Sequence, residues 1–467
     1  MLRHSAFAKT WDAQEQSAET VDYVHNLIQP LLTGTVFNKQ GVAGVHPGRL
    51  ALRPMFNAAK QLSAGFAEQI DKALEAWPVE GRFEALGSSH DLIRQALLAA
   101  MVGSAATRAN AATEATFHEV MEYFVARYAS SGHDARATAE DEATMAKAMG
   151  AGLRIVRAWR EHGQEGTSPA EGKTMLAVMS AEGNSDEQMA AMVINAIIAG
   201  AEAPASTLAH LLQEMAFNPP LQAALAAEVA AVAPKGTEVL DVLDDLELVD
   251  ACVMEALRFF APATLVQRVA IKPTQLGGYE IPAGTVVGIC ITAVHRDQKV
   301  HENPWAFDHR RKLNLTVLKN DNCFATFGGG PRGCPGKYLG KMLLRIALAK
   351  IVQRSEFYSD KRRKDDHLTA VPGKSGGVPK FVEWQVSGIP LLLRPQSRAA
   401  APKERRPASS WLASFALSAA TAATVAVVLG AGHGLSLAEL ALPFVPAPSS
   451  WFGSPGDHWQ AYNVTPY

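Results

Sequence analysis

The sequence predicts a mainly helical fold with small β-sheets, and three observations support that class. Residues 55–260 are rich in Ala, Leu, Glu, Met and Gln and lack the alternation typical of strands. Beyond Ala261, short strand-like segments are separated by glycine and proline turns. A further helix is then predicted over residues 337–352. Because 48% of the 467 residues are hydrophobic, the chain can build a large core.

The composition excludes two classes of protein. The 44 basic and 46 acidic residues give a net charge of −2, so the chain lacks the basic signature of a nucleic-acid binder. We therefore expect no nucleic acid as a partner. Four cysteines are too few for a disulfide framework at this length, and no C-x-x-C pair indicates structural zinc. This usage favours a reducing compartment.

A long central helix of about 30 residues is predicted after Ser185. The segment Ser185–Gln188 forms a capping box, in which the serine and glutamine side chains satisfy each other's backbone amides. A nearly continuous apolar run follows over residues 189–198, so this helix should be buried on most sides. Pro219 and Pro220 end it.

Short strands are predicted in the second half of the chain. The candidates are residues 266–270, 275–281 and 285–291, which lie between glycine and proline turns. Residues 383–395 also have a strand-like pattern. Helices first, then small sheets and one further helix, indicate a single large, mainly helical domain.

A glycine-rich loop, FATFGGGPRGCPG, ends at Gly336 and contains Cys334. The cysteine precedes a predicted helix N-terminus, where unpaired amides and the helix dipole should lower the pKa of its thiol. A thiolate held in this way suits metal ligation. The glycines allow the backbone to approach a flat group closely. Arg332 could meet an anionic group beside the sulfur. The alternative is a buried structural cysteine.

This loop matches the pattern F-x-x-G-x-R-x-C-x-G in full and closely resembles the heme-binding loop of the cytochrome P-450 monooxygenases. The resemblance implies the cytochrome P-450 fold, with a long central helix over the heme and the cysteine loop beneath it. It implies heme b (iron protoporphyrin IX) as cofactor, with Cys334 as the axial thiolate ligand of the iron. The other residues implied to bind the cofactor in this loop are Phe327, Gly330, Arg332 and Gly336.

A buried charge network is implied by two further segments. Glu255 and Arg258 form E-x-x-R, a spacing that places both side chains on one helix face. Alone this motif also fits a surface ion pair. The segment NPWAFDHRR resembles the family's F-D-P-E-R stretch through Phe307, Asp308 and Arg311. Arg311 would be the third member of a structural network with Glu255 and Arg258.

Two more arginines are implied to hold heme propionates. Arg268 matches the family's strand arginine, and guanidinium groups bind carboxylates bidentately. Arg49 fits the arginine of the family's first heme-contacting helix, although an extra residue disturbs the register there. The aromatic or histidine expected before it falls on Val45, with His46 one place away. For Arg49 and His46 the alternative is solvent exposure.

The central helix departs from the family pattern at one position. The motif A-G-x-E ends at Glu202, which could relay protons. The threonine that usually follows is Ala203, which has no hydroxyl. Pro204 should kink the helix and leave the carbonyl of Gly200 without its helical partner. Ser206 offers a hydroxyl, but we expect it to point elsewhere.

The resemblance covers residues 30–395 and lacks several dozen residues at its start. We expect an N-terminally short heme-thiolate catalytic domain over 1–395, a basic Pro/Ala linker over 396–410 and a tail over 431–467. The uncharged residues 411–430 are long enough for a transmembrane helix. Basic residues precede them, so the catalytic domain would be membrane-associated on the cytoplasmic side, with the endoplasmic reticulum as the expected membrane. The alternative is a packed, alanine-rich helix.

The predicted activity is a heme-thiolate monooxygenase that hydroxylates or epoxidises a small apolar organic substrate with O2. Electrons would come from an NAD(P)H-dependent reductase or a ferredoxin-type donor docked on a basic stripe of Lys337, Lys341 and Arg345. Because Ala203 replaces the usual threonine, a peroxide-using or hydroperoxide-rearranging enzyme is the alternative. A heme-binding pseudo-enzyme is the second alternative. The substrate is expected to contact Ile198, Ala199, Ala263 and Val266.

Overall fold

A computed structural model of the chain describes residues 7–8, 59–103, 119, 123, 138–162, 174–234, 236–311, 324–328, 333–359 and 390–396. All of them belong to the first of two compact units, Met1–Arg398; the second is Ala399–Tyr467. Apart from Gln396, the predicted linker, transmembrane helix and tail lie outside the described residues. The same is true of Arg49 and His46.

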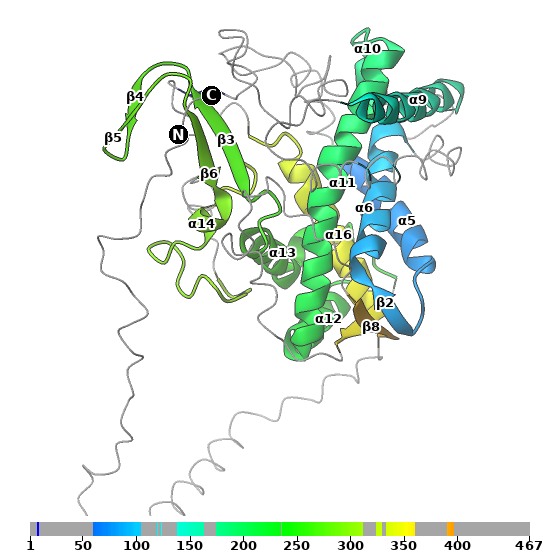
Figure 1. Ribbon diagram of the computed structural model, residues 1–467. Coiled ribbons are helices and arrows are strands. Elements are labelled where there is room, and N and C mark those ends of the chain that lie inside the picture. Colours follow the sequence, from blue (N-terminus) through cyan, green and yellow to red (C-terminus); the bar gives the residue numbers. More distant parts are fainter. Residues whose placement is uncertain are drawn as a thin grey trace, which may run out of the picture. The chain divides into compact units, whose positions relative to one another are not determined.

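The described part of the chain is mainly helical, as predicted (Figure 1). Its helices are α5 (Ala59–Glu75), α6 (Ala85–Val102), α9 (Ala139–His162), α10 (Met175–Ala181), α11 (Asp186–Phe217), α12 (Pro219–Val232), η2 (Leu243–Asp245), α13 (Glu247–Phe259), α14 (Ile291–His295) and α16 (Lys337–Arg354). Its strands are β1 (Phe7–Ala8), β2 (Gly81–Glu84), β3 (Leu265–Ala270), β4 (Thr274–Leu276), β5 (Tyr279–Ile281), β6 (Val286–Cys290), β7 (Ser355–Tyr358) and β8 (Pro390–Pro395).

The central helix α11 has the bounds that the sequence predicts. The capping box forms at its start, because the Gln188 amide donates to Ser185 Oγ and the Ser185 amide donates to Gln188 Oε1. The helix stays continuous through Pro204. It packs against α6 and α9 and also contacts α13 and α16 (Figure 1). These neighbours explain why its sequence is apolar around most of its circumference.

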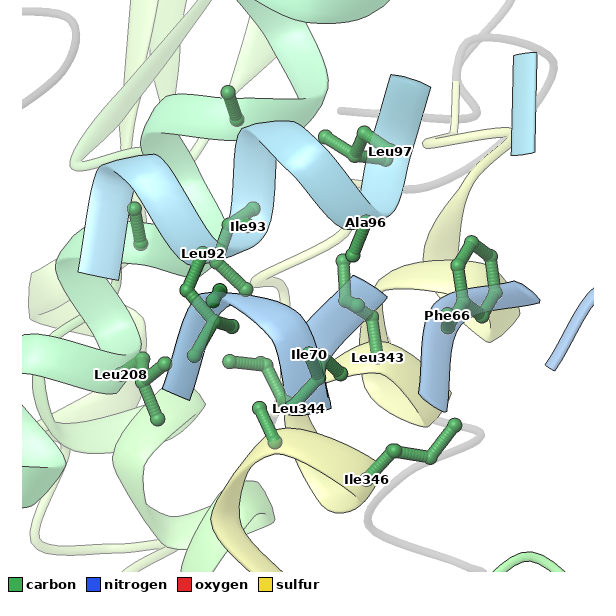
Figure 2. Close-up of a cluster of buried hydrophobic side chains, with 14 of the residues drawn as sticks. Phe66, Ile70, Leu92, Ile93, Ala96, Leu97, Leu208, Leu343, Leu344 and Ile346 are labelled. Atoms are coloured by element: carbon green, nitrogen blue, oxygen red, sulfur yellow. The ribbon is translucent and has the colours of Figure 1, made fainter. Parts of the chain in front are cut away.

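The core lies where α5, α6, α11 and α16 meet. Figure 2 shows aliphatic and aromatic side chains from these helices filling the space between them. Full burial of one such side chain stabilises the fold by roughly 1.5–3 kcal/mol. The labelled members are Phe66, Ile70, Leu92, Ile93, Ala96, Leu97, Leu208, Leu343, Leu344 and Ile346.

Three small antiparallel sheets accompany the helices, with strand orders β1-β3-β6, β2-β8-β7 and β4-β5. Two details of the prediction were wrong. The single strand predicted over 275–281 is a hairpin, because Gly277 and Gly278 both have positive φ, of 59° and 88°, and form its two-residue turn. The strand predicted to reach Ile291 ends at Cys290, where α14 begins. Strand β2, inside the region predicted as helical, was not foreseen.

Among the described residues, α11 is the one helix with the length and mean hydropathy, 1.4, to cross a membrane. However, 62% of its most apolar stretch is buried inside the protein. The core packing described above accounts for that hydropathy, so α11 gives only weak support for a membrane span.

Candidate heme-thiolate site

A buried ion pair on α13 holds together the segments that surround the cysteine loop. Glu255 and Arg258 are both fully buried. Arg258 donates from Nε to Glu255 Oε2 at 2.8 Å and from Nη2 to Oε1 at 2.7 Å, a bidentate pairing. Its remaining N–H groups donate to the carbonyls of His295, Pro304 and Ala306 at 2.8, 3.0 and 3.1 Å. All five guanidinium donors therefore have acceptors, which makes the burial of this charge tolerable.

Arg311 joins this network from the segment after α14. Its Nε lies 3.4 Å from Glu255 Oε1, and the same oxygen accepts from the Asp308 amide at 2.9 Å. The structure thus brings Glu255, Arg258 and Arg311 together. Asp308 instead pairs with Arg310, and that hydrogen bond lowers the pKa of the Asp308 carboxyl.

The cysteine loop is attached to the same helix. Thr326 Oγ1 donates to the carbonyl of Leu257 in α13 at 2.8 Å. The Ala325 amide donates to Nε2 of His295 at 2.9 Å. The Cys334 amide then donates to the carbonyl of Phe327 at 2.7 Å, which closes the loop on itself. Gly330 and Arg332 lie outside the described residues.

Cys334 is exposed and lies three residues before the first residue of α16. Gly336 is the N-cap of this helix, so the amides of its first turn have no helical acceptors. The helix dipole adds a partial positive charge at this end. The first-turn amides and the helix dipole favour an anionic sulfur at this position. Because the sulfur is exposed, it can coordinate the metal ion of a cofactor that lies against the loop.

Arg268 lies in the middle of β3, opposite Val287 of β6, and is buried. Val266, two residues earlier on the same strand, is half-buried, as is Ala263 just before the strand. The alternation of the strand places Val266 and Arg268 on the same face of the sheet.

The comparisons with known proteins agree with this geometry. Residues 164–375, which contain the E-x-x-R helix and the cysteine loop, match the family described as Cytochrome P450. Over these residues the chain is similar to the cytochrome P450 family. The crystal structure of the cytochrome P450DA heme domain has a TM-score of 0.61 at 20% identity, covering 77% of this chain and 81% of that one. At this identity the likeness shows the fold alone, which is the cytochrome P450 fold.

Curated relatives match over a shorter stretch. Cytochrome P450 3A15 of Cavia porcellus is 32% identical over 179 residues, which are 37% of this chain and 35% of the relative. Cytochrome P450 3A5 of Homo sapiens is 33% identical over 174 residues, again 37% of this chain and 35% of the relative. The chain thus spans about a third of the length of these curated cytochromes P450.

One side of α11 is partly accessible along its middle. Ala199 is exposed, and Ala203, Ser206 and His210 follow it at helical spacing and are half-buried. Ser206 lies about one turn beyond Ala203, and the expectation that its hydroxyl points elsewhere stays a prediction. Its Oγ lies 3.5 Å from His210 Nδ1. The side chain of Ile198 lies outside the described residues.

Glu202 turns away from this accessible side toward α6. Its Oε2 lies 3.2 Å from Nε2 of His90, which is ion-pair distance without hydrogen-bond geometry. Both side chains are mostly buried, with 16% and 29% of their surfaces exposed. A carboxylate and an imidazole in contact can hold or exchange one proton. His90 is 112 positions away along the chain and belongs to no motif, so sequence reasoning did not find it.

The predicted basic stripe on α16 was wrong in one member. Lys337 is exposed and Lys341 is half-buried. Arg345 is turned toward η2 and α13, where it forms ion pairs with Asp244 and Asp250, each at 3.3 Å. Its guanidinium is therefore neutralised within the protein and adds little to a docking surface.

Proposed function

We propose that this chain is a heme-thiolate monooxygenase of the cytochrome P450 kind that uses O2 to hydroxylate or epoxidise a small apolar organic substrate. The observation that carries the proposal is the placement of Cys334, exposed at the start of α16 in a loop attached to the buried Glu255–Arg258 pair. Similarity to the cytochrome P450 family over residues 164–375 supports the same activity.

The described residues fit a heme. A sulfur is the ligand that this class of heme enzyme requires, and the loop presents it at a helix N-terminus that favours its anionic form. Bound heme supplies the activation of oxygen, which no protein side chain can perform. In the proposal Cys334 ligates the iron of heme b, Phe327, Gly330 and Gly336 line the cofactor, and Arg49, Arg268 and Arg332 hold its propionates.

The proposed substrate pocket lies along the accessible side of α11. Ala199 offers a small apolar surface there, and we add Ile198, Ala263 and Val266 as further substrate contacts. Small and aliphatic side chains favour an apolar substrate, because they offer no partner for a polar group. We also propose Glu202 as a proton relay, whose Oε2 lies 3.2 Å from Nε2 of His90.

The alternative of peroxide chemistry is favoured by one observation. Ala203 is half-buried on α11, at the position where the motif A-G-x-E is usually followed by a threonine hydroxyl. The nearby hydroxyl of Ser206 lies about one turn further along the helix. An enzyme of this kind would use hydroperoxides without a reductase.

Electrons for the monooxygenase would come from an NAD(P)H-dependent reductase or ferredoxin-type donor bound near Lys337 and Lys341.

The carbon monoxide difference spectrum of the reduced protein tests the proposal. We expect a strongly red-shifted Soret band in the unmodified protein and an unshifted band in Cys334→Ser, because the hydroxyl is a much weaker donor to iron. Cys290→Ser is the matched control, because the sulfur of Cys290 contacts Thr292 Oγ1 and lies outside the cysteine loop. This variant should keep the red-shifted band. A red-shifted band in Cys334→Ser would contradict the proposal that Cys334 is the thiolate ligand. Turnover with peroxide but not with reductase would select the alternative chemistry, and bound heme without turnover would indicate a pseudo-enzyme.

We also propose that residues 411–430 anchor the protein to a membrane with the catalytic domain on the cytoplasmic side, in the endoplasmic reticulum. Twenty uncharged residues after a basic segment support this orientation. The full chain should sediment with membranes, whereas a chain ending at residue 395 should stay in the supernatant. Equal sedimentation of the two would contradict the anchor.

A further inference from the structure

We propose that His295 is a positioning residue for the cysteine ligand: its neutral imidazole joins the buried network of α13 to the cysteine loop and so fixes where Cys334 stands. The proposal rests on the proposed function, because the thiolate role of Cys334 is part of it. The chemistry at His295 itself is visible in the described residues alone.

His295 lies at the end of α14 and is fully buried. Its Nδ1 is 3.0 Å from the carbonyl oxygen of Arg258, and its Nε2 is 2.9 Å from the amide nitrogen of Ala325. The ring stacks on Phe324 with centroids 5.3 Å apart and planes inclined by 22°. The imidazole is thus held on both nitrogens and on one face, so its orientation is determined.

These partners also determine where the proton sits. A backbone N–H can only donate, so Nε2 must accept from Ala325 and carries no proton. A carbonyl oxygen can only accept, so Nδ1 carries the proton and donates to Arg258. A second proton on Nε2 would face the Ala325 N–H directly, and the bond to the loop would be lost. The contact therefore requires the neutral ring.

The loop transmits this placement to the cysteine over a short path. Ala325 is bound by His295, and the next residue, Thr326, is bound to the Leu257 carbonyl of α13. The residue after that, Phe327, accepts from the Cys334 amide at 2.7 Å. Two of these bonds hold the start of the loop to α13 and α14: the one from the Ala325 amide and the one from the Thr326 hydroxyl. If the bond to Ala325 is lost, only the bond from Thr326 remains of the two.

The surroundings keep the ring neutral. Burial lowers the pKa of His295 to about 3, although its bond to the Arg258 carbonyl acts in the opposite direction. The positive charges of Arg258 and Arg296, together with neighbouring His301, lower the pKa further. An unfolded histidine titrates near 6.5. The stability that the neutral ring contributes is therefore complete above about pH 6.5 and is lost as the pH falls toward 3.

Two substitutions separate the two ends of the imidazole. In His295→Gln the amide oxygen can take the place of Nε2 and accept from Ala325. In His295→Asn the shorter amide can reach the Arg258 carbonyl but not the loop. Both keep a polar, hydrogen-bonding side chain of similar burial, so a difference between them reports on the bond to the loop.

The experiment measures amide hydrogen exchange of residues 324–328 and the carbon monoxide difference spectrum of the reduced holoprotein. In His295→Asn we expect exchange at Ala325 to be roughly 2- to 13-fold faster, the range for the net loss of one hydrogen bond. Part of its Soret band should move to the unshifted position at neutral pH. His295→Gln should resemble the unmodified protein and, having no group that titrates, keep the red-shifted band to lower pH. His301→Gln, which removes the neighbouring buried histidine, is the matched control and should keep the band at neutral pH.

The outcomes separate the two proposals. Equal exchange and equal spectra in His295→Asn and the unmodified protein would overturn the positioning role. A missing red-shifted band in the unmodified protein would overturn the proposed function, while the exchange measurement would still decide whether His295 holds the loop. Faster exchange in both variants would show that the imidazole acts through its packing and would also overturn the proposal.

Discussion

Arg258→Met is expected to lower the free energy of unfolding by about 3–5 kcal/mol, because it leaves the buried carboxylate of Glu255 without its bidentate partner. It also removes the donors to three backbone carbonyls that hold the segment from His295 to Ala306. Urea denaturation of the full-length protein, followed by circular dichroism, would measure the change. The buried carboxylate then keeps only Arg311, at 3.4 Å, and the Asp308 amide as partners, so the cost should exceed that of most core substitutions.

Two comparisons make the Arg258 prediction specific. Arg310→Met removes an exposed arginine that pairs with Asp308 and should leave stability unchanged within error. The double variant Glu255→Gln, Arg258→Met removes both charges and should lose less stability than the single one. A loss below about 1 kcal/mol in Arg258→Met would show that the network contributes far less than its burial implies.

Phe357→Ala is expected to lower the free energy of unfolding by about 3–5 kcal/mol, as large aromatic-to-alanine changes in cores do. Phe357 of β7 is fully buried, with ring centroids 5.5 Å from Phe83 and 6.5 Å from Trp77. Its backbone is fixed independently, because Gln222 accepts from its amide at 2.8 Å and donates to its carbonyl at 3.1 Å. The strand should therefore stay in place around a cavity, and the same denaturation experiment would measure it.

Phe357→Leu is the control for this second prediction. Leucine keeps most of the apolar volume, so we expect a loss below about 1.5 kcal/mol. Equal losses for leucine and alanine would contradict a cavity as the cause and would point to the aromatic contacts themselves.

The helices could be predicted from the sequence where local signals were strong. The capping box at Ser185 and the prolines at 219 and 220 defined α11 to within a residue. Strand β2 could not be found, because its four residues are too few to show alternation and its partner β8 lies about 310 residues away. The hairpin of β4 and β5 was missed although the pair Gly277–Gly278 is a recognised turn signal.

The site divides along similar lines. Glu255 and Arg258 could be predicted because a spacing of three places them on one helix face. Arg311 could be predicted through the resemblance to a known motif. The structure places its Nε 3.4 Å from Oε1 of Glu255. His295 and His90 could not, because their partners come from other elements and only tertiary packing brings them together. Arg345 was misjudged because the spacing of charges on α16 says nothing about the carboxylates that η2 and α13 place opposite it.

The sheet of β2, β8 and β7 has a consequence for synthesis on the ribosome. Its central strand is β8, and among the described residues β2 pairs with no other strand, so this pairing cannot form until the chain has grown by about 310 further residues. At 5–20 residues per second, this delay lasts roughly 15–60 s. During that time the backbone groups of β2 are an open edge, available to pair with another nascent chain. Translation speed, and any chaperone that covers residues 81–84, should therefore influence the yield of folded protein.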